Sequence, residues 1–348
     1  MAVTDTIVFT GPGEVDFRKE VIPDLGPSDV LVETHRTAIS QGTEKTLLSG
    51  IDQSTFHFPI RPGYSVAGVV AKVGSDVKGL RIGDRVFATA NHAAECVVTE
   101  RHAYKIPDGV SFDHACFANI ASMAIYAVRR ANFLLGDAVA VIGQGSIGLI
   151  ANAVAKMAGA LPVIALDVDP TRLEMARTFG ADIGVDPRDV SALKDILATL
   201  PGGGVASAIE LSGVGSVIET AIDITRPRGT VFPGSLVGEY RTNIYGPMWW
   251  KGLNIAAGFI VSRPYALDEF INSAATPPYT IVRTGNHFSS ETTTQMDDFR
   301  TFFGMVSTGR LNLESLITDG YSAKDAKIPF GRLYRGDKGM LGAVFRWR

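Results

Sequence analysis

The sequence is poor in cysteine, and we expect no export signal. Its 348 residues include only two cysteines, Cys96 and Cys116, which form no CxxC pair. Sparse, unpatterned cysteine is typical of proteins from a reducing compartment. Residues 1–5 also lack a basic stretch leading into an apolar one, the pattern of a secretory signal. We therefore expect a cytoplasmic protein.

Charge and hydropathy argue against two further classes of protein. Lys and Arg total 33 and Asp and Glu total 36, so the net charge is −3 and no basic arm is visible. This balance gives no electrostatic basis for binding nucleic acid or an anionic membrane surface. No apolar segment approaches the ~20 residues of a membrane-spanning helix. We expect a globular protein with a small-molecule substrate, and 348 residues suit two domains.

The secondary-structure pattern changes near residue 113. Before it, short β segments alternate with Gly- and Pro-containing turns, which predicts a mainly β unit. After it, apolar strands alternate with helical segments, which predicts a doubly wound parallel sheet and an α/β fold class. The early strands are predicted at 6–10, 29–35, 65–73, 85–88 and 94–98. The later elements are predicted at 113–130, 139–142, 147–157, 162–167, 170–179, 206–211, 216–224, 230–232, 254–261, 293–307 and 342–346.

A glycine-rich loop lies between an apolar strand and an amphipathic helix. The strand covers 138–142, the helix 147–157, and a second apolar run at 161–166 ends at Asp167. Glycines in such a loop allow a tight turn and a close approach of the backbone to a pyrophosphate, toward which the helix N-terminus points. This order of elements predicts a dinucleotide site. Its loop residues are Gly143, Gln144, Gly145, Ser146, Ile147 and Gly148.

The acid after the second strand bears on which nicotinamide cofactor binds. The Asp167 carboxylate can accept hydrogen bonds from the adenosine ribose hydroxyls and would repel a 2′-phosphate, so we predict NAD in preference to NADP. Arg172 is the counter-argument, because its guanidinium would accept a 2′-phosphate if Asp167 moved aside. Residues at the carboxyl ends of two later strands are expected to line the nicotinamide half of the site. These are Ser212, Gly213, Gly234 and Ser235.

Several separate segments resemble the medium-chain dehydrogenase/reductase superfamily, which includes zinc alcohol dehydrogenases and zinc-less quinone and enoyl reductases. The segment 62–70, PGYSVAGVV, and the segment 83–86, GDRV, resemble two turns of that superfamily. Residues 250–252 and 313–318 resemble later landmarks. The resemblance implies a GroES-like β-rich catalytic domain at 1–118 and 262–348. It places a Rossmann dinucleotide-binding domain at 119–261.

The positions that hold zinc in zinc-dependent members carry other residues here. By resemblance, the ligands would be a Cys before a Gly-Thr/Ser-Asp turn, a His-Glu pair, and a Cys or acid just before the nucleotide domain. The chain has Gln41, then Tyr64 and Ser65, and a stretch at 118–121 without thiol, imidazole or carboxylate. Zinc needs three nitrogen, sulfur or carboxylate ligands, so we expect no catalytic zinc. A structural zinc site needs four thiolates, and Cys96 stands alone in that region.

Without zinc, side chains must handle the proton that accompanies hydride transfer. The resemblance places Thr43 where the superfamily has a proton-relay hydroxyl, although Thr43 or Ser40 would equally cap a helix that begins near Glu44. Tyr64 would donate to a carbonyl or, with a depressed pKa, act as a base. It would alternatively only fill the space of the metal site. His92, on a loop able to face a cleft, is a proton shuttle or an exposed loop histidine.

Other polar and aromatic residues suggest less about chemistry. Glu44 and Lys45 are expected to form a solvated turn rather than a functional ion pair. Two aromatic patches indicate a sizeable apolar or ring-shaped substrate. The segment 262–290 is expected to be a long loop that covers a site or is an inert insertion. The candidate substrate contacts are Gln41, Phe56, His57 and Trp249.

The leading hypothesis is a zinc-independent, NAD-dependent oxidoreductase. It would interconvert a secondary alcohol and a ketone on a ring-bearing substrate such as a sugar, a cyclitol or another specialised metabolite. One alternative is an enoyl or quinone reductase, since hydride addition to an activated C=C bond needs only modest carbonyl polarisation. Another is a protein that binds NAD(H) without turnover. The apolar edge strand at 254–261 predicts a homodimer formed by strand pairing across a two-fold axis.

Overall fold

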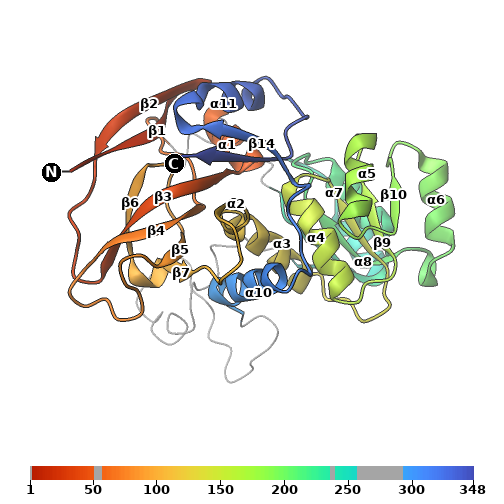
Figure 1. Cartoon of the computed structure of the whole chain (residues 1–348). Helices are drawn as coiled ribbons and strands as arrows, with labels where there is room; N and C mark the ends of the chain where they lie inside the picture. Colours follow the sequence, from red (N-terminus) through yellow and green to blue (C-terminus); the bar gives the residue numbers. More distant parts are fainter. Residues whose placement is uncertain (1, 51–56, 236–239, 257–292) are drawn as a thin grey trace. The chain divides into compact units, whose positions relative to one another are not determined.

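The computed structural model describes residues 2–50, 57–235, 240–256 and 293–348. The chain divides into two compact units, one formed by residues 1–120 and 302–348 and the other by residues 121–301 (Figure 1). We describe each unit by itself. The predicted domain boundaries stay predictions, and the one at 262 lies outside the described residues.

The first unit is built on a mostly antiparallel sheet. Its strands follow the order β14-β15-β3-β4-β5-β7, with β6 also paired to β3. The C-terminal strand β15 pairs antiparallel with β3, so that Ala343 lies opposite Ile39, and the end of the chain completes the N-terminal sheet (Figure 1). The strands are β3 (Asp29–Ile39), β4 (Val66–Val73), β5 (Arg85–Ala88), β6 (Glu95–Thr99), β7 (Ala103–Lys105), β14 (Ile317–Ser322) and β15 (Gly342–Arg346).

A hairpin and several helices complete this unit. Strands β1 (Val3–Gly11) and β2 (Glu14–Val21) form the hairpin, and a bridge between Thr6 and Ala93 links β1 to the loop before β6. Helix α1 (Gln41–Ser49) follows β3 directly and ends at Gly50, whose φ of 67° is left-handed. The other helices are α2 (Phe112–Ala115), the start of α3 (Ala118–Arg130), the end of α10 (Gln295–Ser307) and α11 (Lys327–Tyr334).

Three phenylalanine rings meet in the core between the hairpin, α11 and β15. Phe9 and Phe330 are fully buried, and their rings meet edge to face with centroids 4.8 Å apart. Phe345, from the closing strand, lies 5.6 Å from Phe330. Because each ring comes from a different part of the sequence, this cluster ties both ends of the chain into one core.

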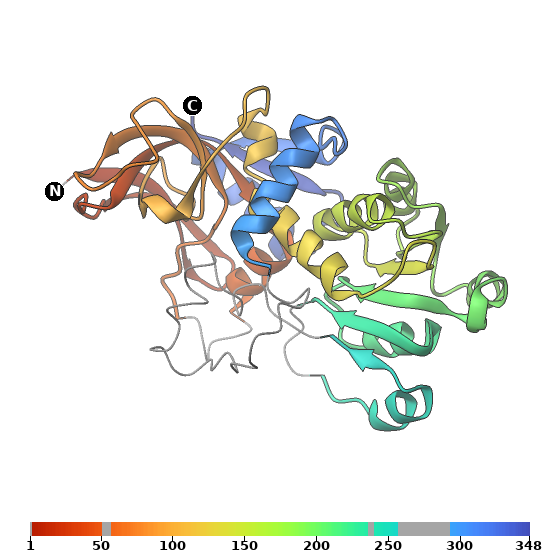
Figure 2. The same cartoon turned by 90° about the horizontal axis from the view of Figure 1, so that it is seen from below.

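The second unit is a parallel sheet with the strand order β10-β9-β8-β11-β12-β13. The order reverses between β8 and β11, the point at which sheets of this kind bind ligands beyond the carboxyl ends of their strands (Figure 2). The strands are β8 (Val139–Ile142), β9 (Val163–Leu166), β10 (Ile183–Val185), β11 (Val205–Glu210), β12 (Thr225–Pro233) and β13 (Asn254–Ile255). The helices are α4 (Ser146–Met157), α5 (Pro170–Thr178), α6 (Val190–Ala198), α7 (Val217–Ile224) and α8 (Tyr245–Lys251).

The predicted α/β fold class is confirmed, since a β-rich unit and a doubly wound parallel sheet are both present. The helix expected at 113–130 is wrong as one element, because α2 ends at Ala115 and α3 starts at Ala118. Of the strand expected at 254–261, the structure describes β13 at Asn254–Ile255, and residues 257–261 lie outside the described residues. Within the described residues, no helix is both long enough and apolar enough to cross a membrane.

We expect Phe9→Ala to lower the free energy of unfolding by about 3–5 kcal/mol, because it removes a buried ring and leaves a cavity against Phe330. Ile82→Ala is the control, since Ile82 is 65% exposed in the same unit and should change stability by about 0.5 kcal/mol or less. Urea unfolding followed by circular dichroism measures both variants. Equal midpoints for the two variants would contradict the assignment of this core.

Candidate functional site

Three hydroxyl-bearing side chains gather where β3 passes into α1. Ser40 is the residue before α1, Thr43 lies in its first turn, and Tyr64 precedes β4. The Tyr64 hydroxyl donates to Oγ of Ser40, and Thr43 is near enough to lower the pKa of Tyr64. The structure therefore brings Ser40 and Tyr64 into direct contact, with Thr43 in the first turn of the helix that Ser40 precedes.

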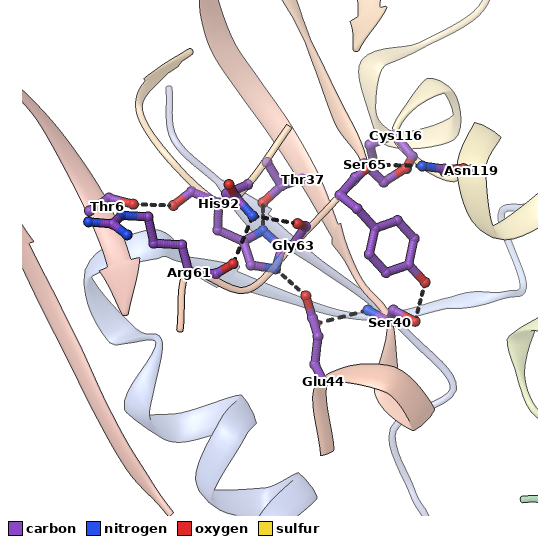
Figure 3. A network of polar contacts seen from close by, with 12 residues as sticks. Thr6, Thr37, Ser40, Glu44, Arg61, Gly63, Ser65, His92, Cys116 and Asn119 are labelled. Atoms are coloured by element: carbon purple, nitrogen blue, oxygen red, sulfur yellow. Dashed lines mark hydrogen bonds and ion pairs between the residues drawn. The ribbon is translucent and has the colours of Figure 1, made fainter. Parts of the chain in front are cut away.

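The turn that carries Tyr64 is fixed from both sides. Asn119 Nδ2 donates to the Tyr64 carbonyl at 2.8 Å, and the Ser65 hydroxyl donates to the carbonyl of Cys116 (Figure 3). Gly63 has a φ of 93°, and a Cβ there would lie 2.7 Å from Cγ of His92. A glycine is thus required by both the backbone conformation and the ring packed against it.

The surroundings of Tyr64 keep its hydroxyl protonated. Burial raises the pKa of Tyr64 above its ordinary value, and the nearby Glu44 carboxylate raises it further, against the opposing hydrogen bonds of Ser40 and Thr43. The predicted alternative of a depressed pKa and a tyrosinate base is therefore wrong. The phenol is a hydrogen-bond donor at neutral pH.

The helix-capping alternative for these hydroxyls is also wrong. Ser40 is the N-cap of α1 by position, but its side chain makes no capping hydrogen bond, and Thr43 lies inside the helix. The Glu44 side chain instead reaches back, and its Oε2 accepts the Ser40 N–H at 3.0 Å. This bond resembles the return contact of a capping box, and it leaves the Ser40 hydroxyl available for Tyr64.

Glu44 and His92 form a buried pair. The expected solvated turn is wrong for Glu44, which is 0% exposed, although Lys45 is exposed. The expected exposed loop position is wrong for His92, which is also 0% exposed. His92 Nε2 lies 2.8 Å from Oε1 of Glu44, and its Nδ1 lies 2.7 Å from Oγ1 of Thr37 (Figure 3). Buried polar groups have to find such partners, and alternating sequence patterns do not reveal them.

The predicted substrate contacts that the structure describes lie on different elements. The Gln41 amide donates to the Leu341 carbonyl at 2.6 Å, which commits its nitrogen to the closing segment of the chain. His57 is exposed, and Phe56 lies outside the described residues. Trp249 is 63% exposed on α8 of the second unit, edge to face with Trp250. The substrate roles of these four residues stay predictions.

The residues at the expected zinc position do not fit that metal. Gln41 offers an amide, Tyr64 a phenol whose pKa is raised, and Ser65 a hydroxyl already bonded to a carbonyl. Asn119, the polar residue of the stretch 118–121, uses its amide nitrogen on Tyr64. Among the residues that the structure describes, no group of three His, Cys, Asp or Glu side chains is arranged to hold a metal ion. Zinc requires a donor set that these side chains lack.

The glycine-rich loop of the second unit fits a pyrophosphate. Gly143 has a φ of 91°, and a Cβ at Gly148 would lie 1.9 Å from the Gly143 carbonyl oxygen. Helix α4 therefore packs directly on the loop. A Cβ at Gly145, the N-cap of α4, would meet nothing within 4 Å, so space is open at the helix N-terminus. Ser146 and Ile147 form its first turn, where main-chain N–H groups bind anions.

Asp167 is anchored by the loop itself. Its Oδ2 accepts the N–H of Gln144 at 2.7 Å, and its Oδ1 accepts the N–H of Asp169 at 3.0 Å. The Gln144 side chain points into the core, where it donates to the Val141 carbonyl and accepts from Asn152. Each carboxylate oxygen keeps a further lone pair for a ribose hydroxyl. Arg172 is half-buried on α5.

The two loops beyond β11 and β12 are joined to each other. The Gly213 N–H donates to the Ser235 hydroxyl at 2.8 Å, and Gly234 N–H donates to the Glu210 carbonyl at 2.9 Å. The Ser212 hydroxyl donates to Oε1 of Glu210 at 2.5 Å. Glu210, 3% exposed at the end of β11, was not among the predicted site residues. Its only signal in the sequence is an acid that ends an apolar strand.

Comparisons with known proteins agree with this two-part construction. A family model described as "Zinc-binding dehydrogenase" matches residues 146–275, and one described as "Alcohol dehydrogenase GroES-like domain" matches residues 26–140. An alcohol dehydrogenase of Cupriavidus necator is 28% identical, with 93% of each chain covered. The sorbitol dehydrogenase of Rattus norvegicus is 30% identical over 65% of this chain and 73% of that protein.

A solved structure extends the agreement to the whole fold. The 2R,3R-butanediol dehydrogenase from Bacillus subtilis superposes with a TM-score of 0.79 at 21% identity, covering 99% of both chains. The chain therefore belongs to the alcohol dehydrogenases of the medium-chain dehydrogenase/reductase superfamily and is an NAD(P)-dependent oxidoreductase.

Proposed function

We propose that this protein is a zinc-independent, NAD-dependent dehydrogenase that interconverts a secondary alcohol and a ketone on a ring-bearing small molecule. The observation that carries the proposal is the hydrogen bond between Tyr64 and Ser40, with Thr43 nearby, beside the positions where the resemblance would place metal ligands. The relatives named alcohol dehydrogenase and sorbitol dehydrogenase support an alcohol or polyol as the substrate class.

The hydroxyl cluster supplies hydrogen-bond donation to the substrate oxygen. Tyr64 donates to Oγ of Ser40, so Ser40 keeps its own hydrogen for a carbonyl oxygen. A donor that itself accepts a hydrogen bond is polarised and donates more strongly. Bound NADH would supply the hydride to the carbonyl carbon. The oxygen gains its proton through this chain of hydroxyls, and a proton from solvent must replace it because the hydroxyls stay neutral, so the chain acts as a relay in general acid catalysis.

NAD is preferred over NADP in this proposal because Asp167 is held in place. Two main-chain N–H groups donate hydrogen bonds to its carboxylate, so its negative charge stays where a 2′-phosphate would have to lie. The arrangement in which Asp167 moves aside for Arg172 would break both hydrogen bonds.

We also propose that the protein is cytoplasmic and forms a homodimer. The dimer is supported by β13, which is the last strand in the described sheet order.

We expect wild-type protein to bind NADH more tightly than NADPH, and Asp167→Ala to weaken NADH binding about 10- to 100-fold, the value of hydrogen bonds to a charged group. Asp167→Asn is the matched control, because its amide oxygen still accepts a loop N–H while the charge that repels a 2′-phosphate is gone. It should gain affinity for NADPH. Fluorescence titration measures all three proteins, and equal or tighter NADPH binding by the wild type would refute the cofactor assignment.

Removal of metal tests zinc independence. After dialysis against a chelator, we expect no stoichiometric zinc by elemental analysis, with NADH binding and turnover retained, since the donor set cannot hold the metal. A screen of alcohols, sugars and cyclitols that follows NADH absorbance supplies the turnover assay, beside an enone reduction assay. One zinc per chain, lost together with activity, would overturn this part of the proposal. Turnover of enones alone would favour the reductase alternative.

Tyr64→Phe should lower kcat about 10²- to 10³-fold with NADH affinity unchanged, because it removes the donor that polarises Ser40. Thr43→Ala should have a smaller effect, since Ser40 remains in contact with Tyr64. Steady-state kinetics on the substrate found in the screen measure both variants. Wild-type turnover in both would show that the cluster only fills space.

A further inference from the structure

His92 contacts the catalytic cluster along two separate routes, and the first runs through its main chain. Its N–H donates to the Pro62 carbonyl at 2.9 Å, and the neighbouring Asn91 side chain donates to the Gly63 carbonyl at 2.9 Å. The imidazole ring also packs directly on Gly63. The turn just before Tyr64 is therefore held by the segment 91–92.

The second route runs through the imidazole. Nε2 of His92 lies 2.8 Å from Oε1 of Glu44, whose other oxygen accepts the Ser40 N–H at 3.0 Å. His92 thus contacts the surroundings of both partners of the Tyr64–Ser40 hydrogen bond. It holds Tyr64 through the turn that precedes it, and it holds Ser40 through Glu44. Because Tyr64 and Ser40 lie on different elements, a residue that holds both limits how far their hydroxyls can separate.

Both nitrogens of the imidazole have polar partners. Nδ1 of His92 shares a hydrogen bond with Oγ1 of Thr37 at 2.7 Å, and Nε2 shares one with Oε1 of Glu44 at 2.8 Å. Trp347 Nε1 can only donate, and it donates to the same Thr37 oxygen at 3.1 Å. The ring faces Phe345, edge to face at 5.1 Å, and Phe330 at 6.2 Å. Glu44 is the charged group on its polar side.

We propose that His92, acting through Glu44, is a positioning residue that holds the Ser40 hydroxyl in register with the Tyr64 hydroxyl. This rests on the proposed function, in which that pair donates to the substrate oxygen. The carboxylate has a second effect through its charge, because it disfavours ionisation of the nearby phenol. The pair therefore keeps the two hydroxyls both aligned and protonated.

Four variants separate positioning from stability. His92→Leu removes both ring hydrogen bonds, and His92→Gln retains a donor and an acceptor. Glu44→Gln keeps an oxygen for the Ser40 N–H and removes the charge, and its amide can donate to Nε2 once the imidazole changes tautomer. Phe330→Leu is the control, because it loosens the packing around the same ring without touching the polar contacts.

Kinetics give the first readout. We expect kcat to fall about a hundredfold in His92→Leu, the loss typical of a small misplacement of a reacting group, and to be partly restored in His92→Gln. NADH affinity should not change in either. Phe330→Leu should lose stability and keep kcat. A kcat in His92→Leu equal to that of Phe330→Leu at matched stability would overturn the positioning role, and should His92→Leu not fold, the same comparison applies to His92→Gln.

The ultraviolet absorbance of tyrosinate gives a readout independent of turnover. The signal of Tyr64 is identified by its loss in Tyr64→Phe, and removal of the negative charge in Glu44→Gln should move its titration to lower pH. No movement in Glu44→Gln overturns the coupling between the pair and Tyr64. If the Tyr64 titration moves to lower pH in Glu44→Gln as expected, but Tyr64→Phe turns over at the wild-type rate, the proposed function is rejected and the coupling between Glu44 and Tyr64 stands.

Discussion

The fully buried carboxylate of Glu44 is the constraint that organises the first unit. A carboxylate removed from water costs several kcal/mol unless donors surround it. Those donors come from the Ser40 main chain and from His92, and His92 in turn depends on Thr37, which accepts from Trp347 at the end of the chain. The closing strand is therefore tied to the site by polar contacts as well as by packing.

In the second unit, a carboxylate is held by main-chain donors. Asp167 takes the N–H groups of Gln144 and Asp169, so the acid and the glycine-rich loop fix each other. Gln144 is fixed from behind by the buried amide of Asn152 on α4. A loop ordered in this way before a ligand arrives loses little further conformational freedom when it binds one.

The two sites differ in how far the sequence predicts them. The dinucleotide loop is local: Gly143, Gly148 and Asp167 lie within one strand-helix-strand unit, and their spacing alone indicates their roles. Thr43 and Tyr64 were found as candidates because a resemblance supplied their positions, and Ser40 was noted beside Thr43 as a possible helix cap. The contact of Ser40 with Tyr64 follows from the pairing of β3 with β4.

Other features of the site depend on tertiary packing that periodicity does not encode. Glu44 and His92 are 48 positions apart, and a charged residue after Gly-Thr has the local pattern of a solvated turn. The direction of the Tyr64 pKa shift depends on burial and on Glu44, so the sequence left both directions open. Elements as short as β10 and α2 were missed or merged for the related reason that three or four residues carry little periodic signal.

In the proposed function, the sign of the charge beside the reacting oxygen is opposite to that at a metal centre. A divalent cation would lower the pKa of nearby oxygens and favour an alkoxide. Here burial of Tyr64 favours O–H over O⁻ by raising its pKa, and the Glu44 carboxylate adds to that effect. A site of this kind stabilises a carbonyl oxygen by donating hydrogen bonds to it rather than by compensating a full negative charge. The electrostatic environment thus matches proton donation to a ketone, and in the reverse direction the alcohol must pass its proton to hydroxyls that stay neutral, so a route onward to solvent is a requirement of the chemistry.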